Sequence, residues 1–239
     1  MLSGGINFIV TIFFLSNVNK IDYGIYLVIL GIFAFAPRFL GGIDDVVIRF
    51  LKDNKNNQQK SFFKLSLIIK IIITILFSSI IIIFFYKYFQ TFKLSTNRSV
   101  NHIVLIVLIL NFIICINKLF TSLVYAHMDY EKIFFINLSA SIFNAILIFI
   151  LVFKFETDII FYVWINIAIT LFQLIFYIYI ANKFLIIDTK NISLFKYTNI
   201  YLKKYYFKYG LPISISHSLG YLQKDHGPNV LIGVFFGPD

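Results

Sequence analysis

Residues 62–86 read FFKLSLIIKIIITILFSSIIIIFFY, and this stretch decides the fold class of the chain. A helix rises about 1.5 Å per residue, so roughly 20 apolar residues cross the hydrocarbon core of a bilayer, which is about 30 Å thick. The run is long enough and is apolar on all sides, whereas the strands of a membrane barrel are short and alternate. Only helices and closed barrels satisfy every backbone group in lipid. This stretch therefore predicts a membrane-spanning helix.

The composition of the whole chain agrees with this prediction. Of its 239 residues, 59% are hydrophobic and 13% are charged, and the mean hydropathy is +0.86. Soluble domains carry roughly 45–50% apolar and about 25% charged residues. The charged side chains are too few to cover a globule with a solvated surface, so the apolar surface must face lipid. We expect an all-α, polytopic transmembrane bundle and not a soluble domain.

The same apolar pattern recurs on both sides of this stretch. We expect about seven helices, which cover residues 1–16, 23–51, 62–86, 102–125, 133–153, 159–187 and 209–236. The first run is too short to span comfortably. The last is interrupted by Pro212 and by a polar cluster at Lys224, Asp225 and His226, so it is expected to be broken.

Basic residues outnumber acidic ones and give the chain a formal charge of +10. Because most of them lie between the apolar runs, they indicate orientation rather than nucleic-acid binding. The connections after the second, fourth and sixth runs hold Arg49, Lys52, Lys55, Lys60, Lys64, Lys132, Lys183, Lys190, Lys196, Lys203, Lys204 and Lys208. The other connections hold only Lys20, Lys87, Lys93, Arg98 and Lys154. The positive-inside rule therefore places the N-terminus and the first group of connections in the cytoplasm.

The longest connection, from Lys183 to Lys208, is rich in lysine. It allows two interpretations. One is an amphipathic helix that lies on anionic lipid headgroups, and the other is a solvated basic loop.

The sequence lacks the common catalytic and metal-binding signatures. It contains no phosphate-binding loop, no His-Glu-x-x-His motif and no cysteine pair with metal spacing. Cys115 is the single cysteine, so an intrachain disulfide is excluded. We expect no enzyme, no cofactor and no metal site.

Charged residues inside the apolar runs are the candidates for function. An Arg at the middle of a spanning helix costs about 2.5–3.5 kcal/mol on insertion scales, so it usually faces a cavity or a partner. Arg38 lies roughly 22 Å along the helix axis from Tyr23. Pro37 beside it can kink the helix, and Gly41 and Gly42 let a neighbouring helix approach. A guanidinium matches phosphate oxygens bidentately, which favours an anionic substrate. The alternatives are a structural ion pair and an Arg that snorkels to the interface.

Two further charges share the helix face of Arg38. Asp45 and Arg49 follow it at i+7 and i+11, which is a single face. Asp45 and Arg49 can pair with each other, whereas Arg38 is too far from Asp45 for a direct salt bridge. Asp45 and Arg49 are expected to lie near the membrane edge.

The remaining candidates lie in the third, fourth and seventh runs. Lys118 either lines a cavity or snorkels, and Lys70 is expected to snorkel. Lys224, Asp225 and His226 are consecutive and cannot share one helix face, so either the helix is broken there, as where a backbone lines a cavity, or at least one of the three lies at the lipid edge. The predicted substrate-binding set is therefore Arg38, Lys118, Asp45, Arg49, Lys224 and Asp225. Separately, Gly210, Ser214 and Ser218 form a small-residue face suited to tight helix packing.

Two regions carry recognisable patterns. The first reads DYGIY at 22–26, GGID at 41–44 and VIRF at 47–50. The second reads YGLPI at 209–213, LGYL at 219–222 and LIGVFFGPD at 231–239. Both resemble the polysaccharide flippases of the MOP superfamily, which also holds the multidrug (MATE) exporters and the lipid II flippases.

The resemblance implies a division of the chain into two unequal parts. Residues 1–187 would form a six-helix first lobe, residues 188–208 a basic cytoplasmic linker, and residues 209–239 the first helix of an incomplete second lobe. An internal repeat agrees with it, because an apolar run followed by a polar break recurs at 9–23 and 230–239. In this family two such lobes face each other around a central cavity. The chain would then be a fragment.

The resemblance also implies a function. Such proteins move polyprenyl-pyrophosphate-linked oligosaccharide from the cytoplasmic to the outer leaflet of the bacterial cytoplasmic membrane, for surface polysaccharides such as O-antigen. Transport would proceed by alternating access, with Arg38 first and Lys118 second as ligands of the pyrophosphate. A coupling ion is expected by analogy only.

Two alternative functions would each require residues that differ from the ones in this sequence. A small-molecule exporter of the same fold would favour acidic and aromatic cavity residues, whereas the candidates here are mainly basic. A membrane oligosaccharide polymerase or ligase would need catalytic groups on a large outer loop, and the expected outer connections are short or lack an acid.

Overall fold

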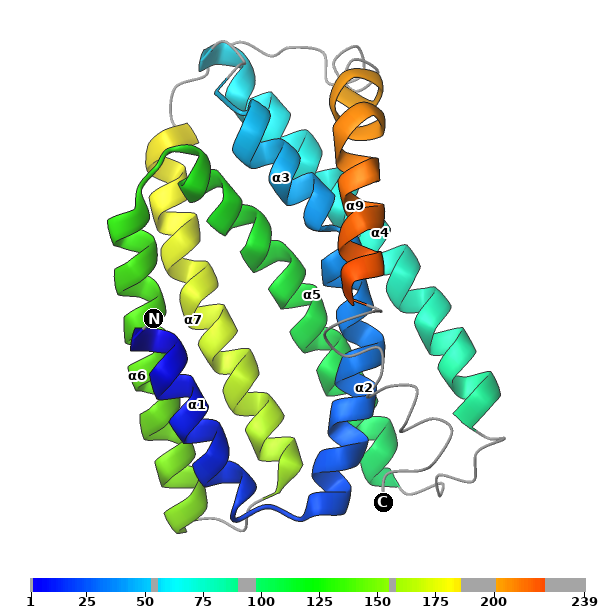
Figure 1. The fold of residues 1–239 in the computed structure, drawn as a ribbon, viewed down its shortest axis with the longest axis vertical. Coiled ribbons are helices and arrows are strands. Elements are labelled where there is room, and N and C mark those ends of the chain that lie inside the picture. Colours follow the sequence, from blue (N-terminus) through cyan, green and yellow to red (C-terminus); the bar gives the residue numbers. More distant parts are fainter. Residues whose placement is uncertain (1, 53–55, 90–97, 155–157, 186–200, 222–239) are drawn as a thin grey trace.

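Every regular element in the described part of the chain is a helix (Figure 1). The computed structural model describes residues 2–52, 56–89, 98–154, 158–185 and 201–221. Its elements are α1 (Leu2–Leu15), α2 (Lys20–Phe39), α3 (Gly41–Phe50), α4 (Asn56–Phe89), α5 (Arg98–Ala126), α6 (Tyr130–Lys154), α7 (Ile159–Leu185), the π-helix η1 (Tyr201–Gly210) and α9 (Leu211–Gly220). The predicted all-α polytopic bundle is confirmed.

Five stretches are long and apolar enough to cross a membrane. They are Asp22–Phe50, Gln59–Ile83, His102–Ala126, Tyr130–Phe153 and Ile159–Phe184, and they match the second to sixth expected helices. The 14-residue α1 is apolar but shorter, as expected for the first run. Residues 222–239 of the expected seventh helix lie outside the described residues. The chain is a multi-pass membrane protein.

The helices alternate in direction along the bundle. In Figure 1, α3, α5 and α7 end at the upper end of the view, and α6 and η1 start there. The helix ends that border the lysine-rich connections therefore share one end of the bundle. That common end is the one that the positive-inside rule assigns to the cytoplasm.

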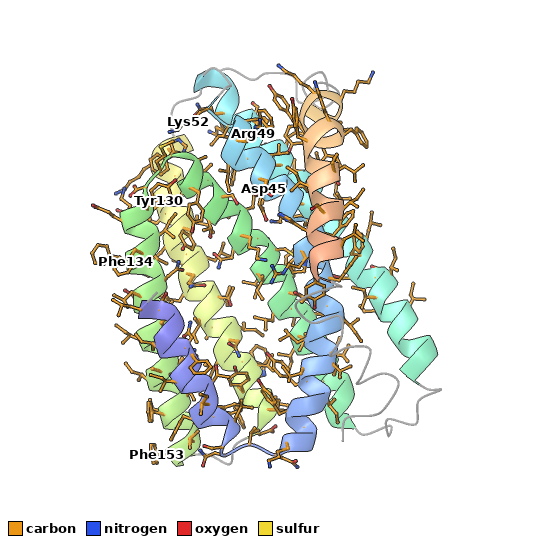
Figure 2. All side chains as sticks on the ribbon, viewed as in Figure 1. Asp45, Arg49, Lys52, Tyr130, Phe134 and Phe153 are labelled. Carbon is orange, nitrogen blue, oxygen red and sulfur yellow. The ribbon has the colours of Figure 1, made fainter. Side chains whose placement is uncertain are left out.

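The outward faces of α4 and α6 are apolar. On α4, Ile80 and Ile83 are 63% and 68% exposed. On α6, Phe134 and Phe153 point away from the bundle in Figure 2, and they are 44% and 75% exposed. A soluble monomer rarely carries so continuous an apolar surface, whereas lipid solvates it readily.

Among the described residues, the two larger of three buried apolar clusters contribute most of the packing of the bundle. The first joins α1, α2, α5, α6 and α7. In this cluster the rings of Phe14 and Tyr162 stack with their centroids 4.2 Å apart. The second cluster joins α3, α4, α5 and η1 around Leu119 and Tyr201, which are fully buried. The second cluster positions the helices that carry the candidate site.

The seventh helix begins earlier than the sequence predicts. Helix η1 starts at Tyr201 and not near residue 209. The Tyr201 ring lies 5.0 Å from that of Phe62, and its hydroxyl lies 2.8 Å from Ser66 Oγ. Residues 201–208 of the basic connection are therefore helical, with tyrosines buried against the bundle, and do not form a solvated loop. Residues 186–200 lie outside the described residues.

A chain of amide hydrogen bonds joins α5, α6 and α7 inside the membrane-spanning region. Asn117 Nδ2 donates to Gln173 Oε1 at 3.3 Å. Gln173 Nε2 in turn donates to Asn137 Oδ1 at 3.2 Å, and the Tyr177 hydroxyl donates to the same oxygen at 3.1 Å. Polar side chains join neighbouring helices in this way because lipid offers them no other partners.

Replacing Asn137 by Leu is expected to lower the free energy of unfolding by about 1 kcal/mol, because hydrogen bonds between membrane helices average about 0.6 kcal/mol each. Equilibrium unfolding in SDS-containing mixed micelles, followed by circular dichroism, measures this loss. Ser79→Ala is the matched control, since Ser79 Oγ donates to the carbonyl of Ile75 on its own helix and to no other helix among the described residues. Equal stability of N137L and wild type would contradict a contribution from the amide chain.

Candidate functional site

A pocket of about 270 Å³ lies between α2, α3, α5 and α9. It brings together ionisable side chains that are far apart in the sequence. Those from α2, α3 and α5 lie within stretches long and apolar enough to cross a membrane, whereas His217 comes from the short helix α9. Its polar lining consists of Arg38, Asp44, Asp45, Lys118, Thr121, Ser122, Tyr125 and His217. Such a concentration of charge inside membrane spans is the usual mark of a functional site.

An interruption between α2 and α3 shapes one wall of this pocket. Pro37 lies inside the last turn of α2 and has no N–H to donate. Helix α2 ends at Phe39 and α3 begins at Gly41, with Leu40 between them at φ −78° and ψ −5°. The N–H of Ile43 donates to the Leu40 carbonyl at 3.0 Å, which is a tighter turn than that of an α-helix. The disruption expected near Pro37 is therefore present.

Arg38 lies just before this interruption and lines the pocket. Its guanidinium carbon lies 5.8 Å from the centroid of the Tyr221 ring, within the range of a cation–π contact. The Tyr221 hydroxyl donates to the Gly31 carbonyl on α2 at 2.6 Å. The chain just after α9 is thus attached to α2 beside Arg38.

Lys118 enters the same pocket from α5. In the part of the chain that the structure describes, no ion pair within 4 Å joins it to a carboxylate. The neighbouring Ser122 hydroxyl donates to the Lys118 carbonyl at 2.8 Å, and Thr121 donates to the Asn117 carbonyl at 2.9 Å. The two hydroxyls are therefore engaged with their own helix, and Lys118 itself is one of the residues that line the pocket.

The prediction that Lys70 snorkels to the interface is wrong. Lys70 is 1% exposed, and its ammonium donates to Asp44 Oδ1 in an ion pair between α4 and α3. An apolar sequence around a lysine does not reveal that a carboxylate on the preceding helix lies at the same depth. With such a partner, the lysine remains buried, because the ion pair offsets part of the free energy of hydration that it loses.

Asp45 and Arg49 do not form the expected pair. Asp45 Oδ2 instead lies 3.5 Å from His217 Nε2 on α9, and no ion pair joins Asp45 to Arg49 among the described residues. The Arg49 guanidinium carbon lies 5.4 Å from the ring centroids of both Phe50 and Tyr209. Figure 2 shows Asp45 and Arg49 in order along α3 toward the upper end of the bundle. Arg49 does not line the pocket, so only Arg38 and Asp45 of this predicted face meet there.

Helices α3 and α9 pack unusually closely where their small residues meet. A Cβ atom built on Gly42 would lie 2.0 Å from the Gly210 carbonyl oxygen and 2.3 Å from Ser214 Oγ. Gly210, Ser214 and Ser218 are all buried. The predicted small-residue packing is confirmed, and it holds α9 against the pocket.

The other predicted residues and the missed ones complete the site. Lys224 and Asp225 lie outside the described residues. The sequence interpretation missed Asp44, although it stands next to Asp45, and His217, which lies one residue before the small-residue position 218. The presence of an acid in one spanning run and a base in the next was the available signal for the Asp44–Lys70 pair. No comparable signal marked His217.

Comparisons with known proteins give no relative. No family model matches the chain, no curated protein is significantly similar to it, and no solved structure matches it. Among the described residues, no group of His, Cys, Asp and Glu side chains is arranged to hold a metal ion.

Proposed function

We propose that this chain belongs to a flippase that translocates polyprenyl-pyrophosphate-linked oligosaccharide across a bacterial cytoplasmic membrane. In this proposal the N-terminus lies in the cytoplasm, and the pocket between α2, α3, α5 and α9 binds the pyrophosphate. The observation that carries it is the convergence of Arg38 and Lys118, from two different spans, on one pocket.

The charges of the lining residues support an anionic ligand. Lys70 pairs with Asp44, so the charges of these two groups offset each other. Arg38 and Lys118 then face Asp45 as the single remaining acid among the described lining residues. Two basic side chains from different helices, Arg38 and Lys118, thus line one pocket within spans where the surrounding lipid offers little screening.

The size and composition of the pocket support a headgroup rather than a whole lipid-linked sugar. A volume of about 270 Å³ is slightly below the range of about 300–1,000 Å³ that is typical of ligand sites. Tyr125 and Ser122 are further polar residues of its lining. In the proposal, the pocket holds the pyrophosphate while the prenyl chain remains in lipid.

Binding of a geranyl-pyrophosphate-linked N-acetylglucosamine to the purified chain in detergent tests this function. Arg38→Ala and Lys118→Ala are each expected to weaken binding about tenfold, because hydrogen bonds to charged groups contribute about 1.5–3 kcal/mol and 1.4 kcal/mol is a factor of ten. Isothermal titration calorimetry gives the affinities.

Lys60→Ala is the matched control, since Lys60 is an exposed lysine of α4 outside the pocket. Wild-type affinity in both R38A and K118A would overturn the proposed site. Binding of an organic cation such as ethidium, with no binding of the pyrophosphate ligand, would favour the small-molecule exporter instead.

A further inference from the structure

His217 forms one edge of the pocket, and it comes from a helix that joins the site only through tertiary packing. Its Nε2 atom lies 3.5 Å from Asp45 Oδ2, and the two side chains are 45% and 38% exposed. Both residues line the pocket that holds Arg38 and Lys118. A histidine side chain thus stands beside the proposed anion site.

The position of the imidazole is built into the crossing of α9 over α3. A Cβ atom on Gly41 would lie 2.6 Å from His217 Nδ1, so the ring rests directly against the backbone of α3. One residue further on, the contact of Gly42 with Gly210 and Ser214 fixes how closely α9 approaches. Any side chain at position 41 would therefore displace the His217 imidazole from its contact with α3.

The charges that face His217 come from three neighbouring helices. They are Arg38 from α2, Asp44 and Asp45 from α3, and Lys118 from α5. Asp44 is already paired with Lys70 of α4, and η1 contributes no described lining residue. When His217 is neutral, the charged groups of the described lining, apart from the Asp44–Lys70 pair, are Arg38, Lys118 and Asp45. When it is protonated, a third cation joins them.

We propose that His217 is a proton-linked ligand of the anion, which the pocket binds more tightly as the pH falls. The inference rests on the proposed function, because it assigns a further binding residue to the same site. Histidine is the side chain whose charge normally changes between about pH 5 and 8. By linkage, a group that attracts the anion only when protonated gains affinity for its proton when the anion binds.

Asp45 has a defined part in this arrangement. Its carboxylate lies 3.5 Å from His217 Nε2, so it stabilises the imidazolium when His217 is protonated. When an anion is bound, the imidazolium lies between this carboxylate and the ligand. Proton uptake and anion binding are therefore coupled through a single side chain of α9.

The test measures the affinity of the purified chain for geranyl-pyrophosphate-linked N-acetylglucosamine at about pH 5.5 and pH 8. This probe is a pyrophosphate diester that does not titrate in the range where histidine does. Wild type is expected to bind about tenfold more tightly at the lower pH. His217→Gln is expected to bind with the high-pH affinity at both, and His217→Lys to bind tightly at both.

His127→Gln is the matched control, because His127 lies at the end of α5 with its ring stacked on Phe184 and does not line the pocket. It should retain the pH dependence of wild type. Binding that is unchanged by pH in wild type, or an equal pH dependence in H217Q, overturns the inference and leaves the proposed function standing. If the probe binds at neither pH, both the inference and the proposed function are overturned.

Discussion

Replacing Lys70 by Met is expected to lower the free energy of unfolding by about 3–5 kcal/mol, the usual effect of removing one partner of a buried ion pair. Lys70 is 1% exposed and Asp44 is 8% exposed. Without the ammonium, the Asp44 carboxylate either stays charged in a medium of low dielectric or takes up a proton, and both are unfavourable. Unfolding in SDS-containing mixed micelles, followed by circular dichroism, measures the loss.

A double variant separates charge from packing in this experiment. Lys70→Met combined with Asp44→Leu removes both charges, and replacing a buried pair by apolar groups is often neutral or stabilising. The double variant is therefore expected to be more stable than K70M alone. Lys64→Met is the control for loss of an exposed lysine on the same helix. A K70M variant as stable as K64M would show that the pair contributes nothing to folding.

Replacing Gly42 by Ala is expected to displace α9 from α3 and to destabilise the protein by at least about 1–3 kcal/mol, the usual effect of overpacking. The new methyl group would lie 2.0 Å from the carbonyl oxygen of Gly210. That oxygen belongs to the backbone, so rotation of a side chain cannot relieve the clash. The pH dependence of binding should also weaken, since His217 would move with α9.

Gly220→Ala provides the matched control on α9 itself. A Cβ atom at Gly220 meets nothing within 4 Å, so this substitution is expected to leave both stability and binding close to wild type. The unfolding assay in micelles and the two-pH binding assay can be applied to both variants. A G42A protein with wild-type stability and wild-type pH dependence would show that the close crossing is not needed to hold α9 in place.

The expected helices were largely predictable because lipid imposes a simple physical rule. A continuous apolar run has to be helical to satisfy its own backbone, and its length then decides whether it spans. This explains why the ranges expected for α4 to α7 agree with the structure. The start of η1 at Tyr201 was not predictable in the same way. Its lysines resemble a solvated connection, whereas its buried tyrosines find partners on α3 and α4.

The candidate site was predictable only in part, for a related reason. Arg38 and Lys118 stand out in sequence because a charge in an apolar run has a large insertion cost. The partner of each charge depends on helix rotation and depth, which local sequence does not encode. Asp45 therefore meets His217 rather than Arg49, although Arg49 has the favourable i+4 spacing.

The sequence by itself determined that this protein is helical, crosses a membrane several times and carries cations within its spans, since each of these follows from the solvation of single segments. Only the tertiary structure decided three contacts between helices. Lys70 forms a buried ion pair with Asp44, the backbone of Gly210 packs closely against Gly42, and His217 lies beside Asp45. These contacts join residues of different helices. Their free energies depend on distances that the packing of whole helices sets, and not on the order of residues along any one of them.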